Sequence, residues 1–341
     1  MSIKQQKQQG LSLVEMMIAL LLSALTLSGA VMLFQQSKSN SVQDEQVARM
    51  QENGRLALRV LSRELSMMGF WGGMLDLSDP GNIDLSGALP VGTDCLTSSG
   101  GWMLKFTGSP STAIPSLQLT DEATNSPYPG CIDDAEILDG ADVLAIKRVA
   151  DQPAMKVSAA GAEDGTVDTN AVYFKTNTVV GAFYEASGAG DEGPTGAVPN
   201  PNRIYQYLPA VFYVRPYSRA VGDAIPALVR ETLVGDSMAA QPLVEGVENL
   251  QLEFGIDGND ADLSADFYTG TPTAAELRNA VSARIYVLVR SVDPVAGYVN
   301  DKTYNLGSTP IDATNDAFYR RVYSTTIQMR NADKLKLYAL N

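Results

Sequence analysis

The sequence contains no histidine, so an enzyme built on this chain would have to use carboxylates or lysine. The chain also has two cysteines. Histidine is the commonest general base and metal ligand in proteins. Its absence removes the Ser-His-Asp and Cys-His arrangements and every histidine-based zinc site. The composition therefore predicts a protein that is not an enzyme and that needs no cofactor.

A single carboxylate interrupts the longest apolar stretch. Residues Leu11–Phe34 are apolar or small except for Glu15, which lies five residues after Gly10. A helix of this length would extend ~36 Å at ~1.5 Å per residue, enough to cross the hydrocarbon of a membrane. An ionisable group inside such a helix is costly and by default marks a functional site. Glu15 is therefore the first candidate for a functional residue.

Cys95 and Cys131 both lie well beyond the apolar stretch, and Gly- and Pro-rich sequence flanks each of them. One even pair on the exported side of a membrane is typical of one disulfide. Closing a loop of this size is worth roughly 3–4 kcal/mol in the chain-entropy model. A disulfide is predicted, with two unrelated buried thiols as the alternative.

The densest acidic segment runs from Asp257 to Asp266. Counted from Asp257, the EF-hand pattern requires Gly where this chain has Asp262 and Glu where it has Tyr268, so that type of calcium loop is excluded. A solvated turn is favoured. The alternative is a looser calcium site, for which the candidate ligands are Asp257, Asn259, Asp260 and Asp262.

The overall charge is acidic: 25 Lys and Arg against 39 Asp and Glu give −14 over 341 residues. Such a field repels phosphate backbones, and the sequence has no basic patch, so no nucleic-acid partner is expected. The charge is expected to keep an exposed, secreted domain soluble.

A long helix is expected to position Glu15. Proline is absent from the end of the apolar stretch until Pro80, and apolar residues recur there at steps of three and four, which is typical of an amphipathic helix. One helix is predicted over Leu11–Met68, apolar nearly all round in its first half and with one apolar stripe in its second. A membrane helix joined at Ser37–Ser41 to a separate soluble helix is the alternative. The stripe consists of Val47, Met50, Gly54, Ala57, Leu58, Leu61, Leu65 and Met68.

The rest of the chain has the pattern of strands joined by long loops. Segments rich in Val, Ile, Tyr and Phe are bounded by Gly, Pro, Asn or Asp, which is typical of strands. The predicted strands are Trp102–Phe106, Asp142–Val149, Val172–Phe174, Val179–Tyr184, Arg203–Pro216, Ala227–Leu233, Leu250–Ile256, Ala283–Ser291 and Tyr319–Met329.

Other segments are expected to connect these strands. Thr273–Asn279 is predicted to form one short helix, and Pro209 and Pro216 predict that the longest strand bends or lies at an edge. The predicted connections are Asp76–Gly101, Thr107–Gly130 and Ser187–Asn202.

Together these elements predict an α+β fold, in which one long N-terminal helix packs on an antiparallel sheet with large loop elaborations. The expected parts are residues 1–10, a short basic segment; 11–34, a membrane-spanning segment; 35–70, its amphipathic continuation; and 71–341, a globular α+β region of one domain or two sub-domains.

The N-terminus resembles the processing site of type IV prepilins. The shared features are a basic leader with Lys4 and Lys7, then Gly10, an apolar residue, and Glu15 at the fifth position after the glycine. The resemblance implies that residues 1–10 are a leader, and that the family's prepilin peptidase cleaves after Gly10.

The same resemblance implies that the new amine of Leu11 is methylated and that Glu15 acts in assembly. Pilins usually have Phe in place of Leu11, but the peptidase depends chiefly on the glycine. A plain signal anchor and a secretory signal peptide cleaved near Ser28–Ala30 are the alternatives.

Segments near both ends of the chain resemble PilW-type minor pilins, whereas residues 75–240 show no resemblance. The similarity implies a pilin-like fold. The segments are Leu61–Gly69, Leu243–Asp257, Val281–Ser291 and Arg320–Asn331.

The resemblance implies a minor pilin that joins a minor-pilin complex to prime type IV pilus assembly, with Glu15 meeting the N-terminal amine of a neighbouring subunit. Its implied partners are the prepilin peptidase, other minor pilins, the major pilin and a pilus-tip adhesin. Residues 11–34 would hold it in the inner membrane by a single pass, with the C-terminal domain in the periplasm, before it enters the pilus. The alternatives are a minor pseudopilin of a type II secretion system, and a membrane-anchored periplasmic enzyme or calcium-binding module.

Overall fold

The computed structural model describes residues 12–74, 82–84, 95, 116–169, 171–194, 196–235, 237–258, 263–312 and 314–331. The chain divides into two compact units, Met1–Arg49 and Met50–Asn341. The helices and strands are α1 (Leu13–Met67), β1 (Ile83–Asp84), β2 (Leu117–Ala123), η2 (Asp134–Glu136), β3 (Ala141–Val149), β4 (Met155–Ser158), β5 (Gly161–Gly165), β6 (Val172–Thr176), β7 (Gly181–Glu185), β8 (Asn202–Arg215), β9 (Ala227–Val234), β10 (Ser237–Glu245), β11 (Val247–Ile256), β12 (Phe267–Thr269), α2 (Ala274–Arg278), β13 (Ala280–Arg290), β14 (Tyr304–Leu306), β15 (Thr309–Ile311) and β16 (Arg320–Gln328).

The prediction of one long helix is confirmed. Helix α1 begins at Leu13 and is continuous through Ser37–Ser41, so the alternative of two separate helices is wrong. It begins in the first unit and ends in the second. Gly69 follows with φ 71°, a left-handed backbone conformation that only glycine adopts without strain, and ends the helix.

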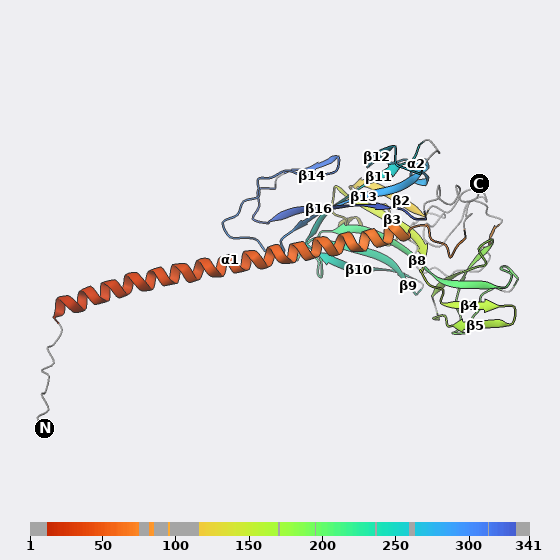
Figure 1. The fold of residues 1–341 in the computed structure, drawn as a ribbon, viewed down its shortest axis with the longest axis horizontal. Helices are drawn as coiled ribbons and strands as arrows, with labels where there is room; N and C mark the ends of the chain where they lie inside the picture. The colour runs from red at the N-terminus through yellow and green to blue at the C-terminus, as the bar shows by residue number, and fades with distance from the viewer. Residues whose placement is uncertain are drawn as a thin grey trace, which may run out of the picture. The chain divides into compact units, whose positions relative to one another are not determined.

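Strand β8 lies inside the larger sheet, to which the described residues contribute ten strands. Figure 1 shows β8 with β3 and β9 beside it. Its first part pairs with β4 and β6 as far as Gln206, and its second part pairs with β3 from Tyr207 and with β9 from Ala210. Phe212 and Val214 point into one core and Val211 and Tyr213 into another, so β8 is covered on both faces.

Pro209 and Pro216 predicted that this strand bends or lies at an edge. The edge position is wrong, because β8 pairs with β3 on one side and with β9 on the other, and the bend stays a prediction. Pro209 pairs with Lys147 of β3, and the ladder to β9 begins only at Ala210, so the missing N–H of Pro209 removes no bond on that side. Thr232 donates its hydroxyl to the Pro209 carbonyl at 3.1 Å. Pro216 follows the last residue of the strand.

A second sheet has the order β12-β11-β13-β16 and is antiparallel throughout. The inward side chains of β13 alternate along the strand, with Ala283, Ile285, Val287 and Val289 fully buried, as expected for a strand with one face on a core. Strands β14 and β15 form a separate hairpin. The α+β fold of one long helix with mostly antiparallel sheets is confirmed.

The largest core lies where the second part of α1 meets both sheets. Met50, Ala57, Leu61 and Leu65 of the helix are buried with side chains of β3, β8, β11 and β13. A second core on the opposite face of β8 is aromatic and centres on Trp71, which stacks on Tyr207 at a centroid distance of 5.9 Å. A third, smaller cluster lies under β4, β6 and β7.

The strand predictions are largely confirmed from β3 onward, and Ala274–Arg278 forms the short helix α2. Thr107–Gly130 was predicted as a connection, and this prediction is wrong at Leu117–Ala123, which forms strand β2. The predicted strand Trp102–Phe106 lies outside the described residues. The strands that no pattern predicted are β1, β2, β4, β5, β10, β12, β14 and β15.

Candidate functional site

The N-terminus of α1 is capped by the side chains of Ser12 and Glu15. The Ser12 N–H donates to the Glu15 carboxylate at 2.9 Å, and the Val14 N–H donates to the Ser12 hydroxyl at 3.3 Å. Together these bonds satisfy two N–H groups that the first helical turn leaves free. The carboxylate also lies at the end of the helix that carries positive partial charge. In the isolated chain Glu15 therefore caps its own helix.

The apolar side chains on either side of Glu15 are exposed in the described residues of the first unit. Leu13, Leu21 and Phe34 are 76%, 63% and 72% exposed. The polar side chains among them are satisfied by their own helix: Ser23 and Ser28 donate to the carbonyls of Ala19 and Ala24 at 2.7 and 2.8 Å. A helix whose polar groups are all bonded internally can enter hydrocarbon or a helix bundle without leaving a group unpaired.

Helix α1 is long and apolar enough to cross a membrane, with an 18-residue window of mean hydropathy 2.3. The predicted cleavage residues Gly10 and Leu11 lie outside the described residues. Glu15, the predicted assembly residue, stands at the start of this segment with its side chain exposed.

The second part of α1 approaches the sheet closely at Gly54. A Cβ built on this glycine would lie 2.4 Å from the ring of Tyr323 in β16, closer than real side chains approach. Gly54 therefore permits the helix to pack directly on the edge strand of the second sheet. Asn53 beside it donates to the Glu245 carbonyl at 2.9 Å.

An ion pair anchors the end of the helix to the larger sheet. Glu64 of α1 accepts from Arg148 of β3 through two parallel bonds of 2.8 and 2.9 Å, and the two side chains are 9% and 10% exposed. Such a fork is the strongest geometry for an arginine and a carboxylate. The partners are 84 residues apart, so no local pattern in the sequence could have joined them.

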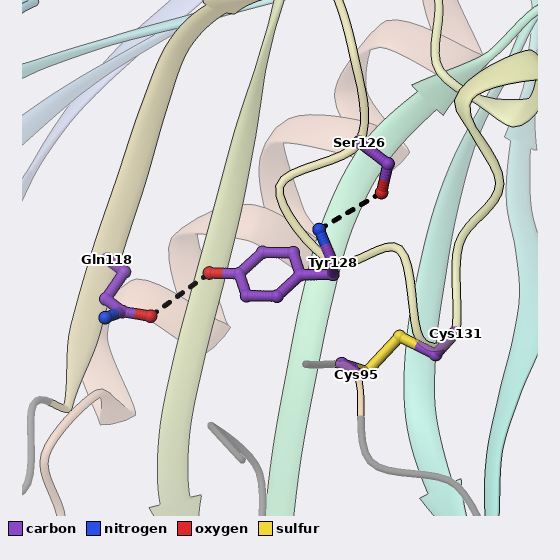
Figure 2. The surroundings of a disulfide bond; sticks show 5 residues. All are labelled: Cys95, Gln118, Ser126, Tyr128 and Cys131. Atoms are coloured by element: carbon purple, nitrogen blue, oxygen red, sulfur yellow. Dashed lines mark hydrogen bonds between the residues drawn. A yellow bond between two sulfur atoms is a disulfide. The ribbon is translucent and has the colours of Figure 1, made fainter. Parts of the chain in front are cut away.

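The predicted disulfide between Cys95 and Cys131 is present, and Cys95 is fully buried (Figure 2). The Gly130 N–H donates to the Cys95 carbonyl at 3.0 Å. Tyr128, nearby, donates its hydroxyl to Gln118 of β2 at 3.2 Å, and burial raises its pKa. The bond therefore ties the loop after β2 to the segment that contains Cys95, next to the aromatic core.

The candidate calcium loop is only partly described. Asp257 is fully buried, and its N–H donates to the Asn279 carbonyl at 3.0 Å. Asn259, Asp260 and Asp262 lie outside the described residues. No cluster of three or more Asp, Glu, His or Cys side chains suited to a metal occurs in the part of the chain that the structure describes. The calcium site stays a prediction.

A buried carboxyl group lies between the two sheets. Asp142 of β3 accepts the N–H of Glu122 at 3.0 Å and the N–H of Leu252 in β11 at 2.7 Å. Burial raises the pKa of Asp142 to about 8, although both N–H groups oppose the shift. Burial, with the nearby charge of Glu122, also raises the pKa of Asp121. Asp142 thus joins the sheets through a group that holds its proton at neutral pH.

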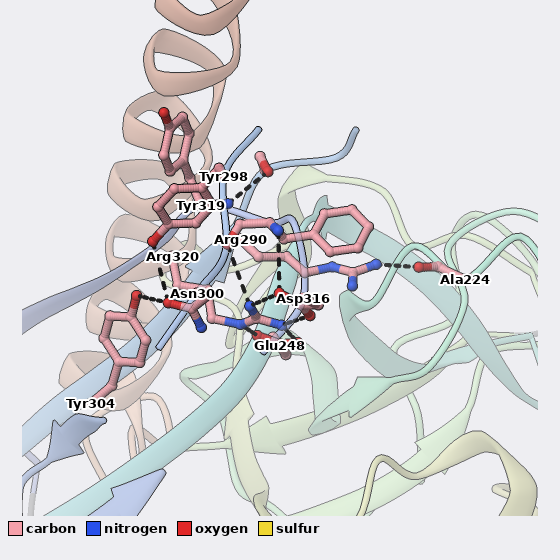
Figure 3. A network of polar contacts seen from close by, with 11 residues as sticks. Ala224, Glu248, Arg290, Tyr298, Asn300, Tyr304, Asp316, Tyr319 and Arg320 are labelled. Atoms are coloured by element: carbon pink, nitrogen blue, oxygen red, sulfur yellow. Dashed lines mark hydrogen bonds and ion pairs between the residues drawn. The ribbon is translucent and has the colours of Figure 1, made fainter. Parts of the chain in front are cut away.

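A polar network fixes the long segment between β13 and β16 (Figure 3). Arg320 of β16 forms ion pairs with Glu248 of β11 and Asp316, and its side chain is 2% exposed. The bonds from Arg320 lower the pKa of Asp316 to about 2. Asn300 accepts the hydroxyls of Tyr298 and Tyr304 at 3.3 and 2.8 Å.

The predicted functional residues fall in different units: Glu15 in the first, and Cys95, Cys131 and Asp257 in the second. Several features of this section were not predicted. The cap at Ser12 had a visible signal, since Ser12 precedes Glu15 by three residues. The Glu64–Arg148 pair had none.

Comparison with known proteins gives two family matches. Residues 211–331 match the model of Type IV Pilus-assembly protein W (PilW). Residues 5–31 match the prokaryotic N-terminal methylation motif. The resemblances to prepilins and to PilW-type proteins are therefore confirmed, and the PilW match includes three of the four segments on which that resemblance was based. Leu61–Gly69 lies outside both matches.

Among solved structures, a type IV-like pilin from Thermus thermophilus has a low similarity to this chain. It is 13% identical with a TM-score of 0.37, over 83% of this chain and 97% of that chain. The search of curated proteins found no match. The apolar helix and the methylation motif indicate membrane anchoring and incorporation into a pilus.

Proposed function

We propose that this chain is a structural minor pilin of the PilW type that joins other minor pilins to prime type IV pilus assembly. The observation that carries the proposal is the start of α1, where most of the exposed apolar surface lies within the match to the N-terminal methylation motif, residues 5–31. An apolar helix surface of this size needs lipid or other apolar helices around it. The membrane supplies lipid before assembly, and the core of the pilus supplies other apolar helices afterwards.

Processing creates the end of the helix that assembly uses. A prepilin peptidase cleaves after Gly10 and methylates the new amine of Leu11. Lys4 and Lys7 stand before the apolar stretch and favour a cytoplasmic leader, which leaves the globular unit in the periplasm. The Cys95–Cys131 bond fits that side of the membrane, because disulfides persist in oxidising compartments.

Glu15 has one role in the free subunit and another in the filament. In the free chain its carboxylate accepts the Ser12 N–H. Among apolar helices a carboxylate without a positive partner is costly, and the N-terminal amine of a neighbouring subunit supplies that partner. Pairing therefore favours one register between subunits. Since Ser12 is the second residue of the processed chain, the same first turn presents both the amine and the acid.

The residues that match PilW supply the surface for specific partners. They include the second part of β8 and all of β9 to β16, and so the whole four-stranded sheet. The Arg320 network holds the long segment between β13 and β16 in one arrangement. A fixed surface of this kind suits a low-copy subunit that recognises particular neighbours.

Replacement of Gly10 tests the function as a whole. Gly10→Val should leave the chain unprocessed, and Gly29→Ala should not, because no atom lies within 4 Å of a Cβ at that second glycine. Immunoblots of membranes report the leader, and electron microscopy of a strain that depends on this subunit reports the pili. A processed band from Gly10→Val would contradict the proposal.

Replacement of Glu15 tests the pairing alone. Glu15→Gln retains an acceptor for the Ser12 N–H and loses the charge, whereas Glu15→Leu loses both. Both variants should be processed normally and should assemble poorly, as measured by co-purification with the other pilins. Normal assembly of Glu15→Gln would show that the charge is not needed.

A further inference from the structure

A small pocket lies in the globular unit between the end of α1 and the larger sheet. Its volume is about 210 Å³, well above the ~10–15 Å³ that one water molecule needs. Strands β3, β8, β9 and β10 and the helix all contribute to it. The residues that matter here are Glu64, Arg148, Leu208, Arg230, Val234 and Gln241.

One side of the pocket carries the buried ion pair. Glu64 and Arg148 use two parallel hydrogen bonds and neutralise each other. A buried pair of this kind is seldom more stable than apolar side chains of the same volume. Stability alone therefore does not account for the choice of charged residues at this position.

The other side carries an arginine whose bonding is incomplete. Arg230 of β9 donates Nη2 to Oε1 of Gln241 in β10 at 2.7 Å. Its Nε is shielded from solvent and has no hydrogen-bond partner within the described part of the chain. A buried N–H without an acceptor is costly, and an acceptor atom placed in the pocket would remove that cost.

The charges in the pocket select an anion. Two guanidinium groups and one carboxylate leave one positive charge, in a chain whose net charge is −14. The planar fork of arginine matches a carboxylate, and a charged acceptor bonds more strongly than the neutral oxygen of Gln241. Leu208 and Val234 supply apolar wall, and Val234 is 54% exposed.

We propose that this pocket binds a carboxylate on a short aliphatic stem, with Arg230 as the residue that receives it. The carboxylate bonds to the Arg230 guanidinium, and its stem lies against Leu208 and Val234. A free organic acid and an acidic side chain of a neighbouring protein share this chemistry. The site is separate from Glu15 and from the exposed apolar part of α1 in the first unit; only the end of α1, at Glu64, lines the pocket.

Calorimetric titration of the full chain in detergent micelles tests the proposal, with sodium butyrate as the probe. Butyrate should give saturable binding, whereas butyramide and sodium chloride should give none. In Arg230→Gln the affinity should fall about tenfold or more, as expected for loss of a charge-assisted bond. Arg219→Gln is the matched control, because that arginine is 85% exposed and does not line the pocket.

Equal binding of butyrate and butyramide, or unchanged binding in Arg230→Gln, would overturn the proposal. The butyrate and butyramide comparison uses the unaltered chain, so it decides the matter even where a variant folds poorly. A photo-crosslinker at Val234 then identifies the source in cells. A crosslinked protein that disappears with Arg230→Gln assigns the carboxylate to a neighbour, and butyrate binding without a crosslink assigns it to a free acid.

Discussion

The two parts of α1 use the same kind of apolar side chain in opposite ways. In the first unit Leu21 is 63% exposed, whereas in the second unit Leu61 is fully buried. Apolar area removed from water stabilises a fold by about 25 cal/mol per Å², so Leu61 already contributes to this chain. The contribution of Leu21 depends on what surrounds it outside the chain.

The polar side chains show the same contrast. Glu45 and Arg49 pair within the first unit at 2.6 Å, and both side chains are 57% exposed. Glu64 pairs with Arg148 of β3, and both are nearly buried. The first part of the helix bonds to itself, and the second part bonds to the sheet. The first part of α1 is therefore free to contact other molecules, whereas the second part is already packed in the fold.

Breaking the buried ion pair should have the largest effect on stability. Glu64→Ala leaves Arg148 buried without its carboxylate, which should lower the free energy of unfolding by about 3–5 kcal/mol. Chemical denaturation of the full chain in detergent micelles, followed by near-ultraviolet circular dichroism, measures the change.

Glu45→Ala is the matched control from the first unit. Its pair is exposed and should change the free energy of unfolding by less than about 0.5 kcal/mol. Equal losses in the two variants would remove the distinction between the two parts of the helix.

The helix and most long strands could be predicted because their signals are local. The apolar stretch, followed by apolar residues spaced three and four apart, predicted α1 to within two residues of its observed ends. Strand β2 was missed because its sequence carries Asp121 and Glu122, and β10 because it includes Pro242. Those strands depend on pairing with β3 and β9, which a single segment does not reveal.

The residues of the candidate site also divide into those with a local sequence signal and those without one. Glu15 and the cysteine pair were visible as isolated residue types in an unusual setting. The position of Pro209 was misjudged because the change of partners along β8 is a property of the whole sheet. Arg230 and Gln241 gave no signal, since the pocket that they line comes from four strands and a helix.

The buried carboxyl of Asp142 should make stability depend on pH. The folded protein keeps a proton there up to about pH 8, whereas the unfolded chain releases it near pH ~4. Stability should therefore fall as pH rises between these values. Asp142→Asn should remove roughly 2–3 kcal/mol of the loss between pH 5 and pH 7, measured by denaturation at both pH values.

An exposed acid provides the comparison. Glu15→Gln changes a carboxylate at the start of α1, outside the globular unit, and should leave the slope unaltered. Glu231, whose pKa burial raises to about 7, contributes in the same direction in every variant. An unchanged slope in Asp142→Asn would assign the pH dependence to Glu231 instead.

Two glycines of α1 should respond differently to the same change. Gly54→Ala places a methyl group against the Tyr323 ring, and overpacking of about 1–3 kcal/mol should exceed the gain of up to ~1 kcal/mol in helix propensity. Gly29→Ala meets no atom within 4 Å and should leave unfolding of the globular unit unchanged. Thermal unfolding measures both, and a stabilised Gly54→Ala would mean that the helix moves away from β16 at little cost.

The smallest effect separates the caps of the two helices. In α2 the Glu276 N–H donates to Thr273 Oγ1 at 3.2 Å and the Thr273 N–H donates to the Glu276 carboxylate at 2.8 Å, which forms a capping box. In α1 the Ser12 hydroxyl accepts from the Val14 N–H instead. Thr273→Ala should lower the free energy of unfolding by about 0.5–1 kcal/mol, because Leu277 of α2 packs on the main core.

Ser12→Ala should leave the free energy of unfolding of the globular unit unchanged and should destabilise only the first turn of α1. Loss of a cap worth ~0.5–1 kcal/mol should speed amide exchange of the first helical turn roughly two- to fivefold. Hydrogen exchange of Leu13–Met16 in micelles measures this, with the amides of Leu61–Leu65 as the internal reference. Faster exchange in both segments would mean that the start of α1 is coupled to the core, and the two parts of the helix would then act as one.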